Sequence, residues 1–192
     1  MLIRNAKASD ADHLVRFINM AADDLPLHFW RRSAGPDGDP WAYGQDRAAR
    51  TTGNFSFRNA WLAEEDGEVA ACLLGYPADP EPGSIAPDTP PIFVPLLELE
   101  ALAPGSWYLN VLATYEAFRG RGHGSALLGH AETLARQTGC ASISLITANT
   151  HAAARQLYAA KGYREIATRP VVRDDWQVDA ETWILMTKAV DG

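Results

Sequence analysis

The sequence has 192 residues, of which 47% are hydrophobic, so it is long enough for one compact domain with a sizeable core. Its 17 lysines and arginines against 24 aspartates and glutamates give a formal net charge of -7, which argues against binding nucleic acid or an anionic membrane through the whole surface. No apolar run approaches membrane-spanning length, and the polar start MLIRNAKASDADHL lacks the apolar stretch of a signal peptide. We therefore expect a single cytoplasmic domain over residues 1–192 that holds any anionic ligand at a local site.

The two cysteines, Cys72 and Cys140, lie in apolar surroundings without a CxxC pattern or a nearby histidine pattern. This context favours buried free thiols over a disulfide or a metal site. We expect no bound metal.

The N-terminal segment predicts a strand followed by a helix. LIRNA has strand character, and SDADHLVRFINMAADDL places Leu14 and Phe17 on one helical face. Ser9 and Asp12 have the spacing of a capping box, so we expect the helix to begin near Asp10.

Residues 25–57 have no clean period and include the turn-rich SAGPDGDP and a predicted helix around GQDRAARTT. We expect irregular helical structure there, on a surface or beside a pocket. NAWLAEEDGEVAACLLGYP follows, and its two apolar runs flank Asp66 and Gly67. This pattern predicts a β-hairpin.

Seven of the twelve prolines lie between Pro77 and Pro95, which excludes a regular helix or a central strand in that segment. A loop of this length inside a compact domain is usually functional or mobile. Two interpretations stay open: a lid or wall of a substrate cleft, and an insertion without a role.

Helices and strands alternate in the rest of the chain. LLELEALA predicts a short helix before Pro104, the apolar spacing from Gly122 to a stop at Gly139 predicts a longer one, and HAAARQLYAAKG predicts a third. The predicted strands are SWYLNVLAT, ASISLIT, YREIATRPVV and TWILMTKAV. This alternation is typical of an α/β fold with a mixed sheet.

The stretch FRGRGHGSALL, residues 118–128, lies between a predicted strand and a predicted helix. Helix N-termini leave backbone N–H groups unpaired and carry partial positive charge, and glycines let a ligand approach the backbone closely. This setting predicts a phosphate site. It is not a P-loop, because it has no lysine, and it is not a GxGxxG fingerprint, because Leu127 stands where the third glycine belongs.

Arg119, Gly122 and Gly124 instead resemble the RxxGxG signature of the GNAT superfamily of acyl-CoA-dependent N-acetyltransferases. A second block, NTHAAARQLYAAKGY, lies one strand and one helix downstream, as in that family, and IRNAKASDADHL is similar to the family's opening strand and helix. The matching residues of the second block are Asn149, Ala153, Leu157, Tyr158, Lys161, Gly162 and Tyr163. The resemblance covers nearly the whole chain and is weakest between Leu25 and Pro104.

The resemblance implies an α/β fold with a mixed, mostly antiparallel central sheet, splayed central strands and flanking helices. The pantetheine arm of the donor, acetyl-CoA, would lie in the gap between SWYLNVLAT and ASISLIT and bond the backbone of Leu112 and Ala113. The turn would hold the pyrophosphate, and CoA would be the product. The cofactor-binding positions implied at the turn are Arg119, Gly120, Arg121, Gly122, His123, Gly124 and Ser125.

Side chains at the turn have different expected roles. Arg119 and Arg121 are expected to add positive charge, because backbone dipoles alone compensate the negative charge of a pyrophosphate poorly. The alternative for each arginine is a solvated position on the surface. The turn uses the backbone of His123, so its side chain is expected in solvent. Ser125 is either an early helix residue or a phosphate contact.

Tyr158 matches the family's tyrosine near the CoA sulfur, which gives a proton to the departing thiolate. A phenol with a pKa of about 10 is protonated at neutral pH and can serve this role. The alternative is a core aromatic residue on its helix. Asn149 either caps the following helix or contacts the cofactor.

The sequence identifies the base that removes the ammonium proton less directly than it identifies Tyr158. Glu98 and Glu100 stand in the apolar PLLELEALA, where a carboxylate can accept a proton through water or recognise a cationic substrate. Their alternative role is the solvated face of a short helix. Asn110 and His28 are further candidates on the acceptor side.

The expected acceptor is a primary amine of a small molecule or peptide. Asp23 and Asp24 would suit a cationic amine, whereas Phe29, Trp30 and Trp41 would suit an apolar or aromatic body. The resemblance also allows a homodimer through the terminal strands.

Two readings compete with the enzyme. One is an acyl-CoA-binding sensor that has lost turnover, and the presence of Tyr158 argues against it. The other is a different phosphate binder that shares only the glycine turn, and the Asn149 to Tyr163 block argues against that.

Overall fold

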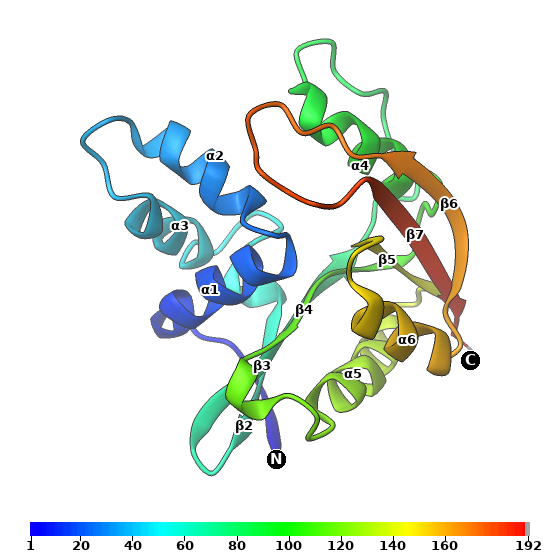
Figure 1. Ribbon diagram of the computed structural model, residues 1–192. Helices are drawn as coiled ribbons and strands as arrows, with labels where there is room; N and C mark the ends of the chain where they lie inside the picture. Colours follow the sequence, from blue (N-terminus) through cyan, green and yellow to red (C-terminus); the bar gives the residue numbers. More distant parts are fainter. Residues whose placement is uncertain (191–192) are drawn as a thin grey trace. The chain divides into compact units, whose positions relative to one another are not determined.

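A computed structural model describes residues 1–190, which divide into two compact units. The first unit comprises Met1–Tyr76 and Asn110–His130, and the second comprises residues 77–109 and the chain from residue 131 onward. The hydrogen-bonded strand order is β1-β2-β3-β4-β5-β7-β6 (Figure 1). In β4 (Trp107–Thr114), residues 107–109 belong to the second unit and residues 110–114 to the first.

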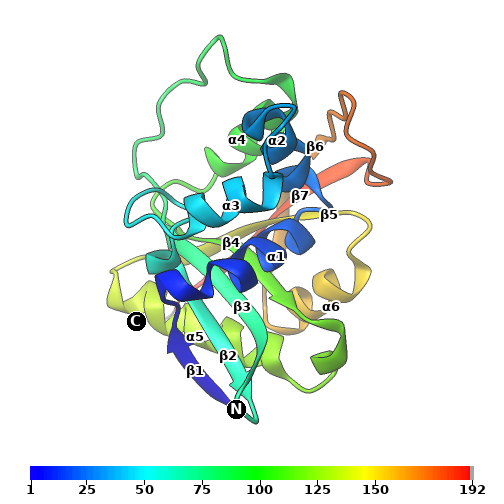
Figure 2. The ribbon, with the colours of Figure 1, turned by 90° about the vertical axis from the view of Figure 1, so that its left-hand side faces the viewer.

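The strands of the first unit are antiparallel. β1 (Leu2–Asn5) pairs with β2 (Ala60–Glu65), and β2 pairs with β3 (Glu68–Pro77), as Figure 2 shows. The connection between β2 and β3 has positive φ angles at Asp66 (53°) and Gly67 (85°), which a two-residue hairpin turn requires. The predicted hairpin is confirmed.

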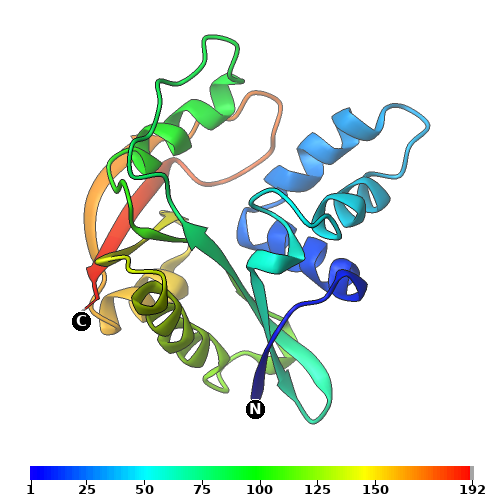
Figure 3. The same ribbon diagram turned by 180° about the vertical axis from the view of Figure 1, so that it is seen from behind.

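Three helices gather in the first unit: α1 (Ala11–Ala21), α2 (Leu25–Ala34) and α3 (Pro40–Ala48) (Figure 3). The expected helical structure in residues 25–57 is confirmed, but residues 25–34 and 40–48 form regular helices rather than irregular ones. α3 begins regularly because the carboxylate of Asp39 accepts the Trp41 N–H at 2.8 Å, and Pro40 needs no N–H bond in the first turn.

The core of the first unit joins α1 to the strands. Leu14 and Phe17 of α1 are fully buried, as the helical periodicity predicts. They belong to one cluster with side chains from β2, β3 and β4, namely Leu62, Cys72, Leu74, Val111 and Ala113.

In the second unit the first half of β4 pairs in parallel with β5 (Ser142–Ala148). This register joins only Trp107–Leu109 to Ile143–Leu145, so β4 leaves β5 after three residues, as expected of splayed central strands. β7 (Thr182–Ala189) pairs antiparallel with both β5 and β6 (Arg164–Pro170). The predicted mixed, mostly antiparallel sheet is confirmed.

Helices α4 (Val94–Glu100) and α6 (Ala152–Ala160) belong to the second unit, and α5 (His123–Gln137) begins in the first and ends in the second. The proline-rich segment is irregular through Pro90, but a 3₁₀ turn and α4 then include its last residues. The predicted loop, which ended at Pro95, is thus too long at its C-terminal end. Pro95 lies in the first turn of α4, where a backbone N–H would have no intrahelical partner and proline is therefore tolerated.

Both cysteines are free, as expected, although only Cys72 is buried and Cys140 is partly exposed. Among residues 1–190, no helix is long and apolar enough to cross a membrane.

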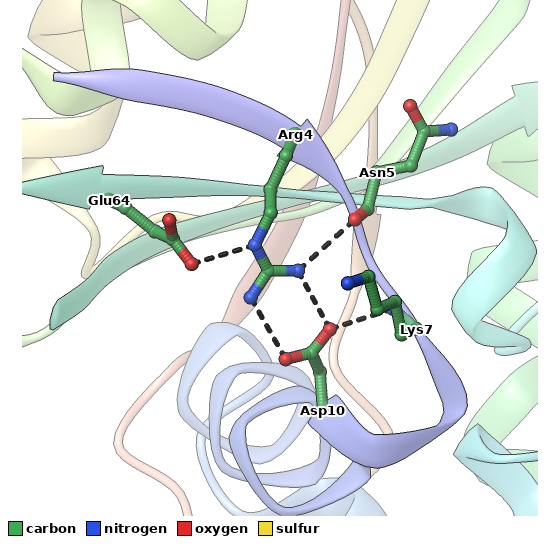
Figure 4. Close-up of polar contacts among 5 residues, drawn as sticks. All are labelled: Arg4, Asn5, Lys7, Asp10 and Glu64. Carbon is green, nitrogen blue, oxygen red and sulfur yellow. Dashed lines mark hydrogen bonds and ion pairs between the residues drawn. The ribbon is translucent and has the colours of Figure 1, made fainter. Parts of the chain in front are cut away.

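A polar network joins β1, β2 and the start of α1 (Figure 4). The Arg4 guanidinium donates to the Glu64 carboxylate at 2.7 Å and to both Asp10 oxygens at 2.8 and 3.0 Å. Asp10 also accepts the Lys7 N–H at 2.7 Å, and Arg4 donates to the Asn5 carbonyl at 3.1 Å. These bonds attach the first helical turn to the edge of the sheet.

The predicted capping box of Ser9 and Asp12 is wrong. The capping carboxylate is that of Asp10, and Asp12 instead accepts hydrogen bonds from Arg16 one helical turn later. The predicted helix start near Asp10 is confirmed, since α1 begins at Ala11.

We predict that Asp10→Asn lowers the free energy of unfolding by about 1–3 kcal/mol, because it removes charge-assisted bonds at a buried carboxylate. The Arg4 hydrogen bonds hold the Asp10 pKa below its usual value. The stabilisation that the ionised Asp10 carboxylate gives the folded state is therefore complete above the unfolded-state pKa of about 3.9. It is lost as pH falls through the lower folded-state pKa.

Denaturant unfolding from pH 7 to about pH 2.5 checks this. The difference in free energy of unfolding between the parent and Asp10→Asn should narrow below about pH 3.9. The control is Asp12→Asn, which breaks an exposed pair and should cost under about 1 kcal/mol. A gap that does not depend on pH, or equal losses in the two variants, would contradict the prediction.

Candidate functional site

The glycine-rich turn connects β4 to α5 within the first unit. A short 3₁₀ helix, Glu116–Phe118, follows β4, and Gly120 and Gly122 then adopt φ angles of 77° and 88° before α5 begins at His123. A Cβ atom built on Gly120 or Gly122 would meet no atom within 4 Å. The backbone of the turn is therefore open to a ligand, beside the helix end where N–H groups lack intrahelical partners.

Both arginines of the turn are exposed. Arg119 donates to the Thr114 carbonyl at 3.4 Å. Arg121 donates to Glu65 at 3.1 Å, and its guanidinium lies 5.3 Å from the centre of the Phe118 ring. Two cationic groups thus flank the exposed glycine backbone, a combination that suits a phosphate anion.

The side chain of His123 is not in solvent, which corrects the expectation from the sequence. It is 2% exposed, its Nε2 lies 2.6 Å from a Glu65 oxygen, and its Nδ1 lies 3.1 Å from the Met1 sulfur. The Phe118 ring contacts it edge-on at 6.1 Å between centroids. Hydrogen bonds from His123 and then Arg121 hold the Glu65 pKa below its usual value, so Glu65 is a carboxylate at neutral pH.

Sequence reasoning did not single out Glu65. It ends β2 just before the hairpin turn and is 58 residues from His123, so no local pattern connects the two. The only signal was a charged residue at the end of a strand otherwise rich in apolar side chains.

The second half of β4 carries the residues predicted to bond pantetheine. Leu112 is half-buried and Ala113 is part of the core. Just past the strand, the Tyr115 N–H donates to the Ala70 carbonyl at 2.9 Å. Asn110, an acceptor-side candidate, donates its amide to the Tyr76 hydroxyl at 3.1 Å.

Tyr158 lies in α6 of the second unit, with a side chain that is 6% exposed. Burial raises the pKa of its phenol far above neutrality, so the group is protonated under physiological conditions. Its ring centre is 5.8 Å from that of Tyr163. The buried phenol therefore holds a proton at neutral pH, which is the first requirement of a general acid.

Asn149 does not cap the following helix, which corrects one of its two expected roles. Its Oδ1 accepts the N–H groups of Glu181 and Thr182 at 3.0 and 3.2 Å, and thereby holds the start of β7. The N-cap residue of α6 is His151, which makes no side-chain capping bond. A contact of Asn149 with the cofactor stays a prediction.

Glu98 and Glu100 of α4 lie in different surroundings. Glu98 forms an ion pair with Arg169 at 2.5 Å, and its side chain is 41% exposed. Burial raises the pKa of Glu100 above its usual value, and a hydrogen bond with Tyr108 opposes the shift. Glu100 is thus the carboxyl group better suited to accept a proton near neutral pH.

The acceptor-side candidates lie in the α1–α3 region of the first unit. Asp23 and Asp24 have positive φ angles between α1 and α2, and the Asp24 carboxylate accepts a hydrogen bond from the Asn19 amide. Trp30 is buried and contacts Trp41 edge-on. These contacts position the side chains within the unit and do not test their predicted roles.

The predicted site residues therefore fall into two groups. The first unit holds Leu112, Ala113 and the turn Arg119, Gly120, Arg121, Gly122, His123, Gly124 and Ser125, and the second unit holds Glu98, Glu100, Asn149 and Tyr158. Within residues 1–190, no cluster of three or more histidine, cysteine or acidic side chains is arranged to hold a metal ion.

Residues 20–163 match the model of the acetyltransferase (GNAT) family, a range that includes the turn and Tyr158. This chain belongs to the GNAT acetyltransferase family. Its members transfer acyl groups, and the resemblance carried by the glycine turn and the Asn149 to Tyr163 block is confirmed.

Solved structures support the same fold. An N-acetyltransferase from Staphylococcus aureus Mu50 has a TM-score of 0.68 and 17% identity, covering 98% of this chain and 100% of that one. A polyamine N-acetyltransferase from Drosophila melanogaster, which forms N-acetylagmatine, has a TM-score of 0.65 and 19% identity, covering 98% and 99%. A GNAT acetyltransferase from Elizabethkingia anophelis with acetyl-CoA bound has a TM-score of 0.55 and 17% identity, covering 91% and 88%. No curated protein matches the sequence significantly.

Gly122→Ala is predicted to lower the free energy of unfolding by about 1–2 kcal/mol, because a Cβ is strained at a φ of 88° even with open space around it. The matched control is Gly129→Ala within α5, where no atom lies within 4 Å of the added Cβ. That change should raise stability by about 0.5–1 kcal/mol. Thermal unfolding of both variants checks that the two stability changes have opposite signs. A stabilised Gly122→Ala would show that the positive φ angle at Gly122 does not constrain the turn.

Proposed function

We propose that this chain transfers an acetyl group from acetyl-CoA to a primary amine of a small molecule or peptide, by direct attack of the amine on the thioester. The observation that carries the proposal is the open glycine backbone of the turn, flanked by Arg119 and Arg121 at the start of α5. Family membership supports acyl transfer. The polyamine and agmatine N-acetyltransferases of similar fold act on amines, which supports a nitrogen acceptor.

The donor side of the proposal lies in the first unit. Backbone N–H groups from Arg121 to Ser125 would hold the pyrophosphate, because they combine unpaired donors with the positive end of the helix dipole. Arg119 and Arg121 would supply full positive charges. The backbone of Leu112 and Ala113 would bond the pantetheine amides.

Tyr158 would act as the general acid. When the amine nitrogen bonds the thioester carbon and the carbon–sulfur bond breaks, the Tyr158 phenol gives its proton to the departing sulfur. The phenolate then recovers a proton from the positively charged nitrogen, directly or through water, which leaves a neutral amide and a neutral thiol. The high pKa caused by burial keeps Tyr158 protonated and ready for this step.

Glu100 would act as the general base that makes the amine neutral before attack. Its carboxylate would accept the ammonium proton, directly or through water, and the raised pKa brings its basicity closer to the operating pH. Glu98 is less suited to the role, because Arg169 already engages its carboxylate. The cytoplasmic location and the homodimer stay predictions.

Thermal unfolding and thiol release test the function together. Acetyl-CoA or CoA at about 100 times its dissociation constant should stabilise the protein by roughly 2.7 kcal/mol. A panel of polyamines, agmatine and peptide amines should then produce thiol release from acetyl-CoA. No stabilisation would contradict the proposal, whereas stabilisation without release from any acceptor would indicate an acyl-CoA sensor instead.

Tyr158→Phe should lower kcat by about 10²-fold, within the range for loss of a general acid, while the dissociation constant for CoA stays within about twofold. The matched control is Tyr163→Phe on the neighbouring ring. The Tyr163 hydroxyl is buried and finds no hydrogen-bond partner among residues 1–190, so its removal should leave turnover intact. Equal rates for Tyr158→Phe and the parent would remove the assigned role.

Glu100→Gln should abolish the acidic limb of the kcat/KM pH profile. In the parent, the rate rises with pH as Glu100 loses its proton, at a pKa above the usual carboxyl value. Glu98→Gln is the control and should keep that limb. If the limb survives Glu100→Gln and disappears in Glu98→Gln, the base assignment is wrong.

A further inference from the structure

The Glu65 carboxylate joins the β2–β3 hairpin to the glycine turn. One of its oxygens lies 2.6 Å from His123 Nε2, and the other accepts from Arg121 at 3.1 Å. Both bonds cross more than 55 residues of sequence and lie within the first unit. A single carboxylate thus contacts two residues of the turn.

His123 is the buried side chain that attaches the turn to the rest of its unit. Residues 119–122 are exposed, Gly124 and Ser125 are partly buried, and His123 is the buried member of residues 119–125. Gly120 and Gly122 have no side chains and adopt positive φ angles, so neither of them fixes the conformation of the turn by packing. His123 is also the first residue of α5, so its bond to Glu65 lies where the N–H groups without intrahelical partners begin.

We propose that His123 and Glu65 are positioning residues for CoA binding: the buried imidazole, held by the hairpin carboxylate, fixes the turn in the conformation that receives the pyrophosphate. Glu65 also holds the Arg121 guanidinium beside the turn, over the Phe118 ring. Pre-organisation of this kind raises affinity because less conformational freedom is lost on binding. The inference rests on the proposed function.

The hairpin carries the carboxylate that bonds His123. β2 pairs with β1 as far as Glu64 and with β3 as far as Glu65, which lies opposite Glu68 in the register. The backbone of Glu65 is therefore paired within the sheet, and a hydrogen bond from a buried imidazole to its side chain is strong because the acceptor is charged.

The test measures CoA binding by calorimetry in four variants. His123→Leu fills the buried position with an apolar side chain of similar size but removes the hydrogen bond to Glu65. Glu65→Ala removes the carboxylate that accepts this bond. Each should raise the dissociation constant for CoA about tenfold, and the double variant should raise it no further than Glu65→Ala alone, because His123 acts through its bond to Glu65. His123→Gln, whose amide can still donate to Glu65, should stay within about threefold of the parent.

Steady-state kinetics supply the readout that separates positioning from chemistry. KM for acetyl-CoA should follow the dissociation constant, while kcat at saturating donor stays within about twofold of the parent. Glu68→Ala is the matched control: it removes the same charge from the opposite, exposed position of the hairpin and should change neither value.

Unchanged CoA binding in His123→Leu and Glu65→Ala would overturn the inference while the proposed function stands. Additive losses in the double variant would also overturn it, since the two residues would then act separately. If the parent itself binds no CoA, the proposed function and this inference fail together. Glu65 is partly exposed, so Glu65→Ala keeps the test available if His123→Leu does not fold.

Discussion

The first turn of α5 has backbone N–H groups that the helix itself does not use, and the site depends on keeping them accessible. Gly120 and Gly122 leave the outer side of the turn without side chains, while His123 anchors its inner side. Arg119 and Arg121 add charge without covering the backbone. Glu65 bonds both Arg121 and His123 and so connects this segment to the β2–β3 hairpin.

The two units carry different kinds of functional groups. The first unit carries cationic and backbone donors that suit the phosphate end of the donor, and its residues are exposed at the turn. The second unit carries Tyr158 and Glu100, whose pKa values are both raised by burial. Desolvation thus keeps the phenol protonated at neutral pH, although it also makes the phenol a weaker acid, and it makes the Glu100 carboxylate a stronger base.

The sequence predicted what short-range patterns determine. Asp66 and Gly67 indicate a hairpin because few residues adopt positive φ, and the glycines after β4 indicate the turn for the same reason. Helical periodicity located α1, α5 and α6. A helix overlapping α3 was also predicted, around GQDRAARTT, but its start at Pro40 after Asp39 and the regularity of α2 were not, because this region has no clean helical period.

What the sequence did not predict depends on distant residues. The pairing of β1 with β2 brings Glu64 beside Arg4, and the Arg4 guanidinium bonds both Glu64 and Asp10. Asp10, rather than Ser9, therefore supplies the capping group. His123 is buried because the hairpin places Glu65 next to it. Asn149 bonds the start of β7, more than thirty residues later in the chain.

We propose that the turn at Arg119–Ser125 binds the pyrophosphate of the donor. Residue-resolved amide hydrogen exchange tests this with acetyl-CoA and with acetyl-pantetheine, which lacks the pyrophosphate. We expect acetyl-CoA to slow exchange at Gly122, His123, Gly124 and Ser125, and acetyl-pantetheine to leave these rates unchanged. If acetyl-CoA binds and these amides exchange at unchanged rates, the turn does not hold the pyrophosphate.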